Sequence, residues 1–268
     1  MVCKAWTRSQ RTSPMLFLDN TAVALNRRKN RYFRRQLTKL KEGQLDPRDW
    51  QALCLGQSDT PKAVYVPIPK AANTSIRTAL KPCFGLASVD VENIHQDERI
   101  DKRSLKESLS LAADDAYIFT VVRHPAERIY STYKNKLGWF DPKHRFKIKK
   151  HFGHAKNLGI SRGVSFESFL EKLCATPAWL MDCHFAPQVD LLAYALDDPR
   201  LKTFHMESLA DAWPQIVNDV EAHCGIAPDR NLAVLNRSEK PTQPFTPQEK
   251  RLIEFLFRED FETFGYGW

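Results

Sequence analysis

The chain has 268 residues, of which 43% are hydrophobic and 27% are charged, as in ordinary soluble globular proteins. Its length allows one domain with a full hydrophobic core, and no apolar run reaches the ~18 residues that a membrane-spanning helix needs. Met1–Gln10 lacks the apolar core of a signal peptide, so the composition argues against an integral membrane protein and we expect a soluble, cytoplasmic one.

The first 60 residues are predicted to form a basic, mostly helical extension. Between Asn26 and Lys41, basic and apolar side chains are interleaved as in a basic amphipathic helix. The basic residues of this segment are Arg27, Arg28, Lys29, Arg31, Arg34, Arg35, Lys39 and Lys41. A second basic run covers Lys143–Lys156. Such runs are most often solvated faces, but with a net charge of +8 they can also form a track for a polyanion, either a glycan or a nucleic acid.

A phosphate site is predicted where the first buried strand ends. Val64–Pro69 has the pattern of a short strand, Lys70 follows it, and a helix capped by Thr74 or Ser75 comes next. A helix start leaves backbone N–H groups unpaired and carries partial positive charge, which favours a bound phosphate. Lys70 can then contact the bridging oxygen of that phosphate.

This segment differs from a Walker loop, which has the pattern G-x-x-x-x-G-K-[ST] and uses glycines to wrap a polyphosphate. Here the lysine precedes the turn and the turn contains no glycine. The order suits one terminal phosphate better than a triphosphate with its metal. A strand–Lys–helix junction is common in α/β proteins, so this motif alone does not establish a phosphate site.

A second strand–helix junction predicts a second phosphate site. Ala116–Val122 is an apolar strand that ends at Arg123, and Pro125 opens a helix that contains Ser131. A guanidinium and a hydroxyl together clamp an oxyanion well, although an arginine here could also be a solvated charge at a helix start. Two phosphate sites indicate a bis-phosphorylated nucleotide.

The segments PKAANTSI and VVRHPAERIYSTYKNKL resemble the 5′-phosphosulfate and 3′-phosphate motifs of sulfotransferases that use 3′-phosphoadenosine 5′-phosphosulfate (PAPS). The likeness is strongest to the carbohydrate sulfotransferases, whose second motif is R-[DEN]-P-x-x-R-x-x-S-x-Y. Three shorter elements follow in the family's order: His184–Gln188 (H-x-x-P-Q), Phe204–Leu209 (F-E-x-L) and Asp260–Tyr266 (D-F-x-x-F-G-Y). The chain departs from the family at His124, where an acidic or amide residue is usual, and at Asn73, where a small residue is usual.

The resemblance implies one sulfotransferase domain over residues 61–268, with a P-loop-like three-layer α/β fold. Strands that alternate with helices also indicate a parallel sheet flanked by helices, with ligands at the carboxyl ends of the strands. The implied reaction moves a sulfuryl group from PAPS to a hydroxyl of an anionic or neutral glycan, without a metal. The implied donor-binding residues are Lys70, Ala71, Ala72, Asn73, Thr74 and Ser75 for the 5′-phosphate, and Arg123 and Ser131 for the 3′-phosphate.

Sulfuryl transfer also needs a general base that deprotonates the acceptor and a cation that stabilises the leaving phosphate. Lys70 is predicted to be that cation. His184 and His95 are the candidate bases, and His184 is preferred, although a histidine beside a Pro-Gln turn can equally be structural.

Two other classes of function stay open at this point: a P-loop-type nucleotide kinase and a basic nucleic-acid-binding protein with a degenerate nucleotide fold. The missing Walker glycines oppose the kinase, and the Arg123–Ser131 spacing is unexplained in the nucleic-acid-binding alternative, so no nucleic-acid partner is expected. Animal members of the family are anchored in the Golgi, so a lumenal catalytic fragment is the alternative to a cytoplasmic protein. The six cysteines form no C-x-x-C pair, and we predict neither a metal site nor obligate disulfides.

Overall fold

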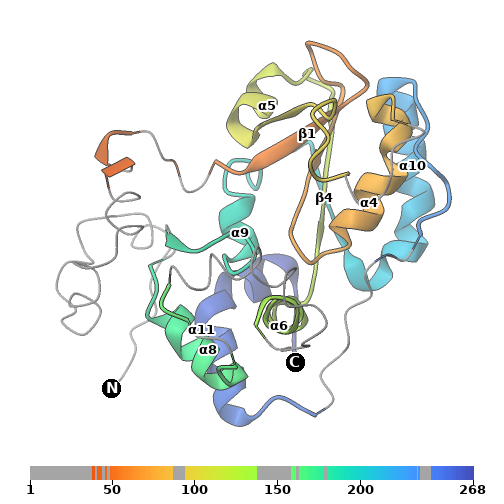
Figure 1. Cartoon of the computed structure of the whole chain (residues 1–268). Helices are drawn as coiled ribbons and strands as arrows, with labels where there is room; N and C mark the ends of the chain where they lie inside the picture. Colours follow the sequence, from red (N-terminus) through yellow and green to blue (C-terminus); the bar gives the residue numbers. More distant parts are fainter. Residues whose placement is uncertain are drawn as a thin grey trace. The chain divides into compact units, whose positions relative to one another are not determined.

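The computed structural model describes residues 38–39, 41–43, 46, 49–86, 94–137, 158–160, 163–177, 180–233, 235 and 243–268 (Figure 1). The second basic run and most of the first lie outside these described residues. The chain divides into two compact units. One combines Arg48–His124 with Gln188–Glu239; the other combines Pro125–Pro187 and Lys240–Trp268 with the few described residues before 48. Among the helices of the described part, none is long and apolar enough to cross a membrane.

The first unit, which we call the sheet unit, is built on a five-stranded sheet in the order β3-β1-β2-β4-β5. Its strands are β1 (Gln51–Leu55), β2 (Ala63–Val66), β3 (Lys102–Ser104), β4 (Tyr117–Val122) and β5 (Leu201–His205). Strands β2, β4 and β5 are parallel, as predicted.

Strands β1 and β3 pair antiparallel at one edge, so the sheet is mixed rather than wholly parallel. The short connection 56–62 explains this, because a parallel pair needs a crossover of a dozen or more residues and β1 is joined to β2 by a turn. Strand β1 also lies inside the segment 1–60, for which we predicted a mostly helical extension, so the sheet begins before residue 61. The division into an extension and a single domain stays a prediction.

Helices cover both faces of the sheet. The helical elements of this unit are α4 (Asn73–Ala79), η2 (Lys81–Phe84), α5 (Leu105–Leu111), α9 (Gln188–Leu191), η6 (Met206–Ser208) and α10 (Leu209–Cys224). Tyr65 and Phe119 share one buried cluster with Ile76 of α4 and Trp213 of α10. On the opposite face, the Cys54 side chain lies 3.7 Å from the Ser108 hydroxyl of α5. Figure 1 shows α4 and α10 side by side, with α5 across the sheet from them. The three-layer α/β arrangement is thus confirmed, while its P-loop-like character stays a prediction.

The parallel register brings three loops to one edge of the sheet. Val66 pairs with Thr120, and Val122 pairs with His205, so β2, β4 and β5 end close together. Ligands of α/β proteins bind at this carboxyl edge of a sheet. Lys70 and Arg123 both follow strands that end there.

The second unit, the helical unit, consists of α6 (Pro125–Lys136), α8 (Phe166–Cys174) and α11 (Pro247–Phe264). Helix α11 contacts both of the others. Their apolar faces form one buried cluster that includes Ile129, Phe169 and Phe257. Pro125 opens α6, as predicted. This unit therefore presents Ser131 and the H-x-x-P-Q histidine on a packed helical support.

Candidate functional site

The turn between β2 and α4 has a left-handed backbone at two residues. Lys70 has φ 70° and Ala72 has φ 54°, and only Gln57 shares this feature among the other described residues that are not glycine. A left-handed conformation costs such residues about 1–2 kcal/mol each. Strained turns of this kind cluster at binding sites, where they can aim successive N–H groups at one anion. The sequence did not indicate this turn, because glycine normally marks left-handed positions.

Helix α4 starts earlier than predicted. Its N-cap is Ala72, no side chain caps it, and Thr74 and Ser75 lie inside the helix, so the predicted cap at Thr74 or Ser75 is wrong. The left-handed Ala72 turns the chain directly into the helix, and the first helical bond runs from Ile76 N to Ala72 O at 3.0 Å. The N–H groups that precede Ile76 are those that a helix start leaves for another acceptor. Ala71 differs from them, because its N–H donates to Ile68 O at 3.3 Å.

Thr74 connects α4 to His95, one of the two candidate bases. Its hydroxyl Oγ1 lies 3.1 Å from His95 Nε2, and His95 is exposed. Lys102 Nζ donates to the backbone oxygens of His95, at 3.2 Å, and of Asp97, at 2.8 Å, which fixes the turn that carries His95. Burial, with the nearby Arg77 charge, lowers the pKa of Lys102. The structure thus places His95 beside the Lys70 turn in the sheet unit.

The other two polar side chains at the start of α4 have structural partners. Asn73 Oδ1 accepts a 2.9 Å hydrogen bond from Nε of Arg77, which is only 2% exposed. Ser75 Oγ accepts from Leu235 N at 3.0 Å. Asn73 therefore holds a buried arginine one helical turn later.

Arg123 lies directly against the Lys70 turn. Its Nη1 donates to Lys70 O at 3.3 Å, and the residue is 5% exposed, so Arg123 is not a solvated helix-start charge. Gln188 of the H-x-x-P-Q element fixes its backbone from both sides: Oε1 accepts from Arg123 N and Nε2 donates to Arg123 O, each at 2.9 Å. Glu207 Oε1 accepts from His124 N at 2.8 Å. This last bond uses the backbone of residue 124 and does not depend on which side chain stands there.

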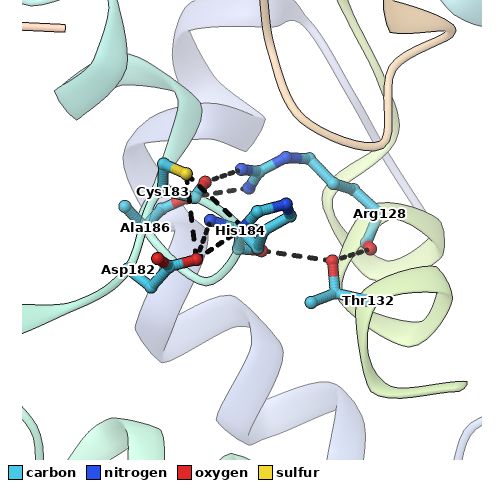
Figure 2. A network of polar contacts seen from close by, with 6 residues as sticks. All are labelled: Arg128, Thr132, Asp182, Cys183, His184 and Ala186. Carbon is cyan, nitrogen blue, oxygen red and sulfur yellow. Dashed lines mark hydrogen bonds and ion pairs between the residues drawn. The ribbon is translucent and has the colours of Figure 1, made fainter. Parts of the chain in front are cut away.

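In the helical unit, α6 holds the H-x-x-P-Q loop through buried polar contacts (Figure 2). Arg128 is 1% exposed and donates to two carbonyl oxygens of the loop, Ala186 O at 2.7 Å and Cys183 O at 2.9 Å. Thr132, one turn later, donates to His184 O at 3.1 Å. Arg128 is therefore a buried structural arginine, not a solvated charge.

His184 forms a close pair with Asp182. Its Nδ1 lies 2.5 Å from Asp182 Oδ1, which also accepts from His184 N at 3.1 Å, and the His184 side chain is 28% exposed. Figure 2 shows the two side chains facing each other at the loop. Cys183 Sγ lies 3.4 Å from the same Nδ1. Within the described residues these three form one group of possible metal ligands, with ligand atoms within 4.8 Å of one another. The hydrogen bonds among the three residues already account for their closeness. The expectation that no metal is needed stays a prediction.

Comparison with known protein families matches residues 57–267 to the sulfotransferase family, which is well over half of the chain. The chain belongs to the sulfotransferase family. No curated protein and no solved structure gave a match. The protein is therefore an enzyme of the transferase class, and this assignment favours sulfuryl transfer over the kinase and nucleic-acid-binding alternatives.

The predicted site residues of this sulfotransferase fall into both units. Lys70, the Ala71–Ser75 segment, His95 and Arg123 lie in the sheet unit, where Lys70 and Arg123 are in contact. Ser131 and His184 lie in the helical unit; Ser131 is 2% exposed on α6, next to Thr132. Sequence reasoning missed Asp182 and the structural role of Arg128. The signal that could have indicated Asp182 is its acidic side chain two positions before His184.

We predict that Ala72→Gly stabilises this sulfotransferase by about 1 kcal/mol, because glycine adopts the left-handed conformation of residue 72 without strain. The matched control is Ala222→Gly on the exposed surface of α10, which should destabilise by about 0.5–1 kcal/mol. Urea unfolding of the two variants measures both changes. A loss of stability at both positions would contradict the left-handed turn.

Arg128→Met is expected to lower the free energy of unfolding by about 2–4 kcal/mol, since it leaves a buried and a partly buried carbonyl oxygen without their donor. Methionine fills much of the same volume, so the loss of hydrogen bonds dominates. Arg251→Met is the control on the exposed face of α11 and should change stability by less than about 0.5 kcal/mol. Equal effects of the two substitutions in urea unfolding would show that Arg128 does not hold the loop.

Proposed function

We propose that this sulfotransferase transfers a sulfuryl group from PAPS to a hydroxyl of a carbohydrate acceptor. The observation that carries the proposal is the contact between the two motif segments. Arg123, at the end of β4, donates to the backbone of Lys70, at the end of β2, where α/β proteins bind their ligands. The two residues thus lie in one unit, beside a helix start that no side chain caps.

The proposal gives each donor-binding group one role. Backbone N–H groups of Ala72–Ser75 hold the 5′-phosphate, since the N–H of Ala71 already has an acceptor in the turn. Arg123 and Ser131 bind the 3′-phosphate, as the resemblance implies, and so select the bis-phosphorylated nucleotide over one that lacks this group. Charge-assisted hydrogen bonds are the strong ones, which makes a buried arginine an effective selector.

Lys70 stabilises the transition state of the transfer. During in-line displacement at sulfur, negative charge grows on the phosphate oxygen that leaves. An ammonium group placed at that oxygen binds the transition state more tightly than the ground state. The phosphosulfate group carries less charge than a triphosphate, so in this proposal one lysine supplies the stabilisation that a metal supplies in a kinase.

We further propose His184 as the general base. If Asp182 accepts a hydrogen bond from Nδ1–H of His184, the ring is held in the tautomer whose Nε2 can take a proton from the acceptor hydroxyl. His95 is the second candidate, because its Nε2 contacts Thr74 beside the Lys70 turn. His184 is preferred because a carboxylate orients its ring, whereas His95 is oriented by a neutral hydroxyl.

The net charge of the protein supports an anionic glycan as the acceptor. With a net charge of +8, the protein attracts polyanions, and a sulfated or uronate-bearing glycan is a hydroxyl-rich polyanion. The second basic run and most of the first, which would guide such a chain, lie outside the described residues. Transfer of radiolabel from PAPS to a panel of acceptors tests this proposal: a uronate-bearing glycan, its partly sulfated form, a neutral oligosaccharide and a simple phenol. We expect label on a glycan. Label on the phenol alone would overturn the carbohydrate assignment while leaving the donor assignment intact.

A further inference from the structure

Two cysteine thiols meet in the sheet unit, away from the Lys70 turn. Cys83 lies in η2, just after α4, and Cys224 is the last residue of α10. The sulfur of each is 3.5 Å from the same backbone oxygen, that of Ile226. Both cysteines are reduced in this structure, with Cys83 buried and Cys224 half-buried.

The surrounding backbone holds the two cysteines close. Gly56 N donates to Cys83 O at 3.2 Å, and a Cβ added at Gly56 would lie only 2.8 Å from the Cβ of Cys224. Residue 56 must therefore be a glycine for the end of α10 to pack against it while its N–H binds Cys83 in η2. The loop after α10 is also bonded to the end of α4, through Asp229 N and Ala79 O at 2.8 Å. The two thiols thus lie against the same backbone oxygen. Backbone hydrogen bonds hold both η2 and the loop after α10 in place around them.

We propose that Cys83 and Cys224 are a modification site at which peroxide forms a reversible disulfide between η2 and the end of α10. The bridge ties η2, which directly follows α4, to the end of α10, and so stabilises the sheet unit. This proposal is independent of the sulfuryl-transfer chemistry.

The half-buried cysteine is the one that reacts first. The contact with Cys83 lowers the pKa of Cys224, whereas the same contact and burial raise the pKa of Cys83. The Cys224 thiolate attacks hydrogen peroxide, giving a sulfenic acid and hydroxide. The Cys83 thiol then attacks the Cys224 sulfur; the S–S bond forms and the sulfenic oxygen leaves as water. Peroxide accepts the two electrons, and a dithiol such as dithiothreitol returns them.

Peptide mapping of the full-length protein tests the proposal. The protein is treated with hydrogen peroxide, alkylated without reduction and digested. We expect a linked peptide pair that contains Cys83 and Cys224, with a mass about 2 Da below the sum of the reduced peptides, that disappears on reduction. The Tm should rise by about 5–10 °C on oxidation and return on reduction, because the bridge closes a long loop of the unfolded chain.

Cys174→Ser is the matched control, a half-buried cysteine outside this contact, and it should keep the linked pair and the Tm shift. Cys224→Ser and Cys83→Ser should abolish both. The mapping of the unsubstituted protein does not depend on any variant folding correctly. Alkylated Cys83 after complete oxidation of Cys224, or Cys224 linked to a different cysteine, would overturn the proposal.

Discussion

Lys70→Ala is expected to lower the turnover number for sulfuryl transfer by ~100-fold or more, with only a moderate loss of donor affinity. The lysine acts on charge that develops in the transition state, so its removal should change kcat much more than the Kd for 3′-phosphoadenosine 5′-phosphate. The fold should persist, because the Lys70 contact with Arg123 uses the backbone oxygen of residue 70 and alanine retains it. Steady-state kinetics with labelled PAPS measures the turnover number, and a thermal melt shows whether the fold persists.

Lys62→Ala is the matched control for this prediction. Lys62 is exposed and lies at the opposite end of β2 from Lys70. It contributes the same charge to the molecule but none to the proposed site. Wild-type turnover in Lys70→Ala, or equal losses in the two variants, would reduce Lys70 to a structural or generally electrostatic role.

His184→Ala is expected to lower kcat by ~100- to 10,000-fold, the range that general base catalysis contributes. Imidazole added to the assay should restore part of the activity, which a purely structural histidine would not allow. Asp182→Asn should lower kcat by at least ~10-fold with little change in the acceptor KM, because asparagine no longer enforces the tautomer that Asp182 selects. Asp182 is a positioning residue in this account.

His95→Ala separates the two candidate bases. If His184 is the base, His95→Ala should cost much less than His184→Ala, since His95 would then only support the turn through Thr74. The reverse order, with imidazole rescue of His95→Ala, would assign the base to the sheet unit instead. Thermal melts of each variant exclude loss of the fold as the cause.

The parts of the site that follow local sequence patterns could be predicted. A fully buried strand followed by a cation and then by a helix is visible in the sequence at both Lys70 and Arg123, and both cations lie at the carboxyl edge of the sheet. The start of α6 at Pro125 was predicted for the same kind of reason, because proline is favoured in the first turn of a helix.

The parts that depend on tertiary partners could not be predicted. Ala72 adopts a left-handed conformation that alanine disfavours, so no local signal marked it, and the expected side-chain cap was placed too late. Arg128 looks like a surface charge until the loop that receives its hydrogen bonds is known. Strand β1 is short and follows a basic segment, and its antiparallel place between β3 and β2 depends on a turn with no distinctive motif.

Isothermal titration with 3′-phosphoadenosine 5′-phosphate and with adenosine 5′-phosphate tests the central claim most directly, because the two ligands differ only in the 3′-phosphate. If Arg123 and Ser131 bind that group, each charge-assisted hydrogen bond should contribute ~1.5–3 kcal/mol. We therefore expect 3′-phosphoadenosine 5′-phosphate to bind at least ~100-fold more tightly, and Arg123→Ala to remove most of the difference. Equal affinity for the two nucleotides would contradict the assignment of PAPS as the donor.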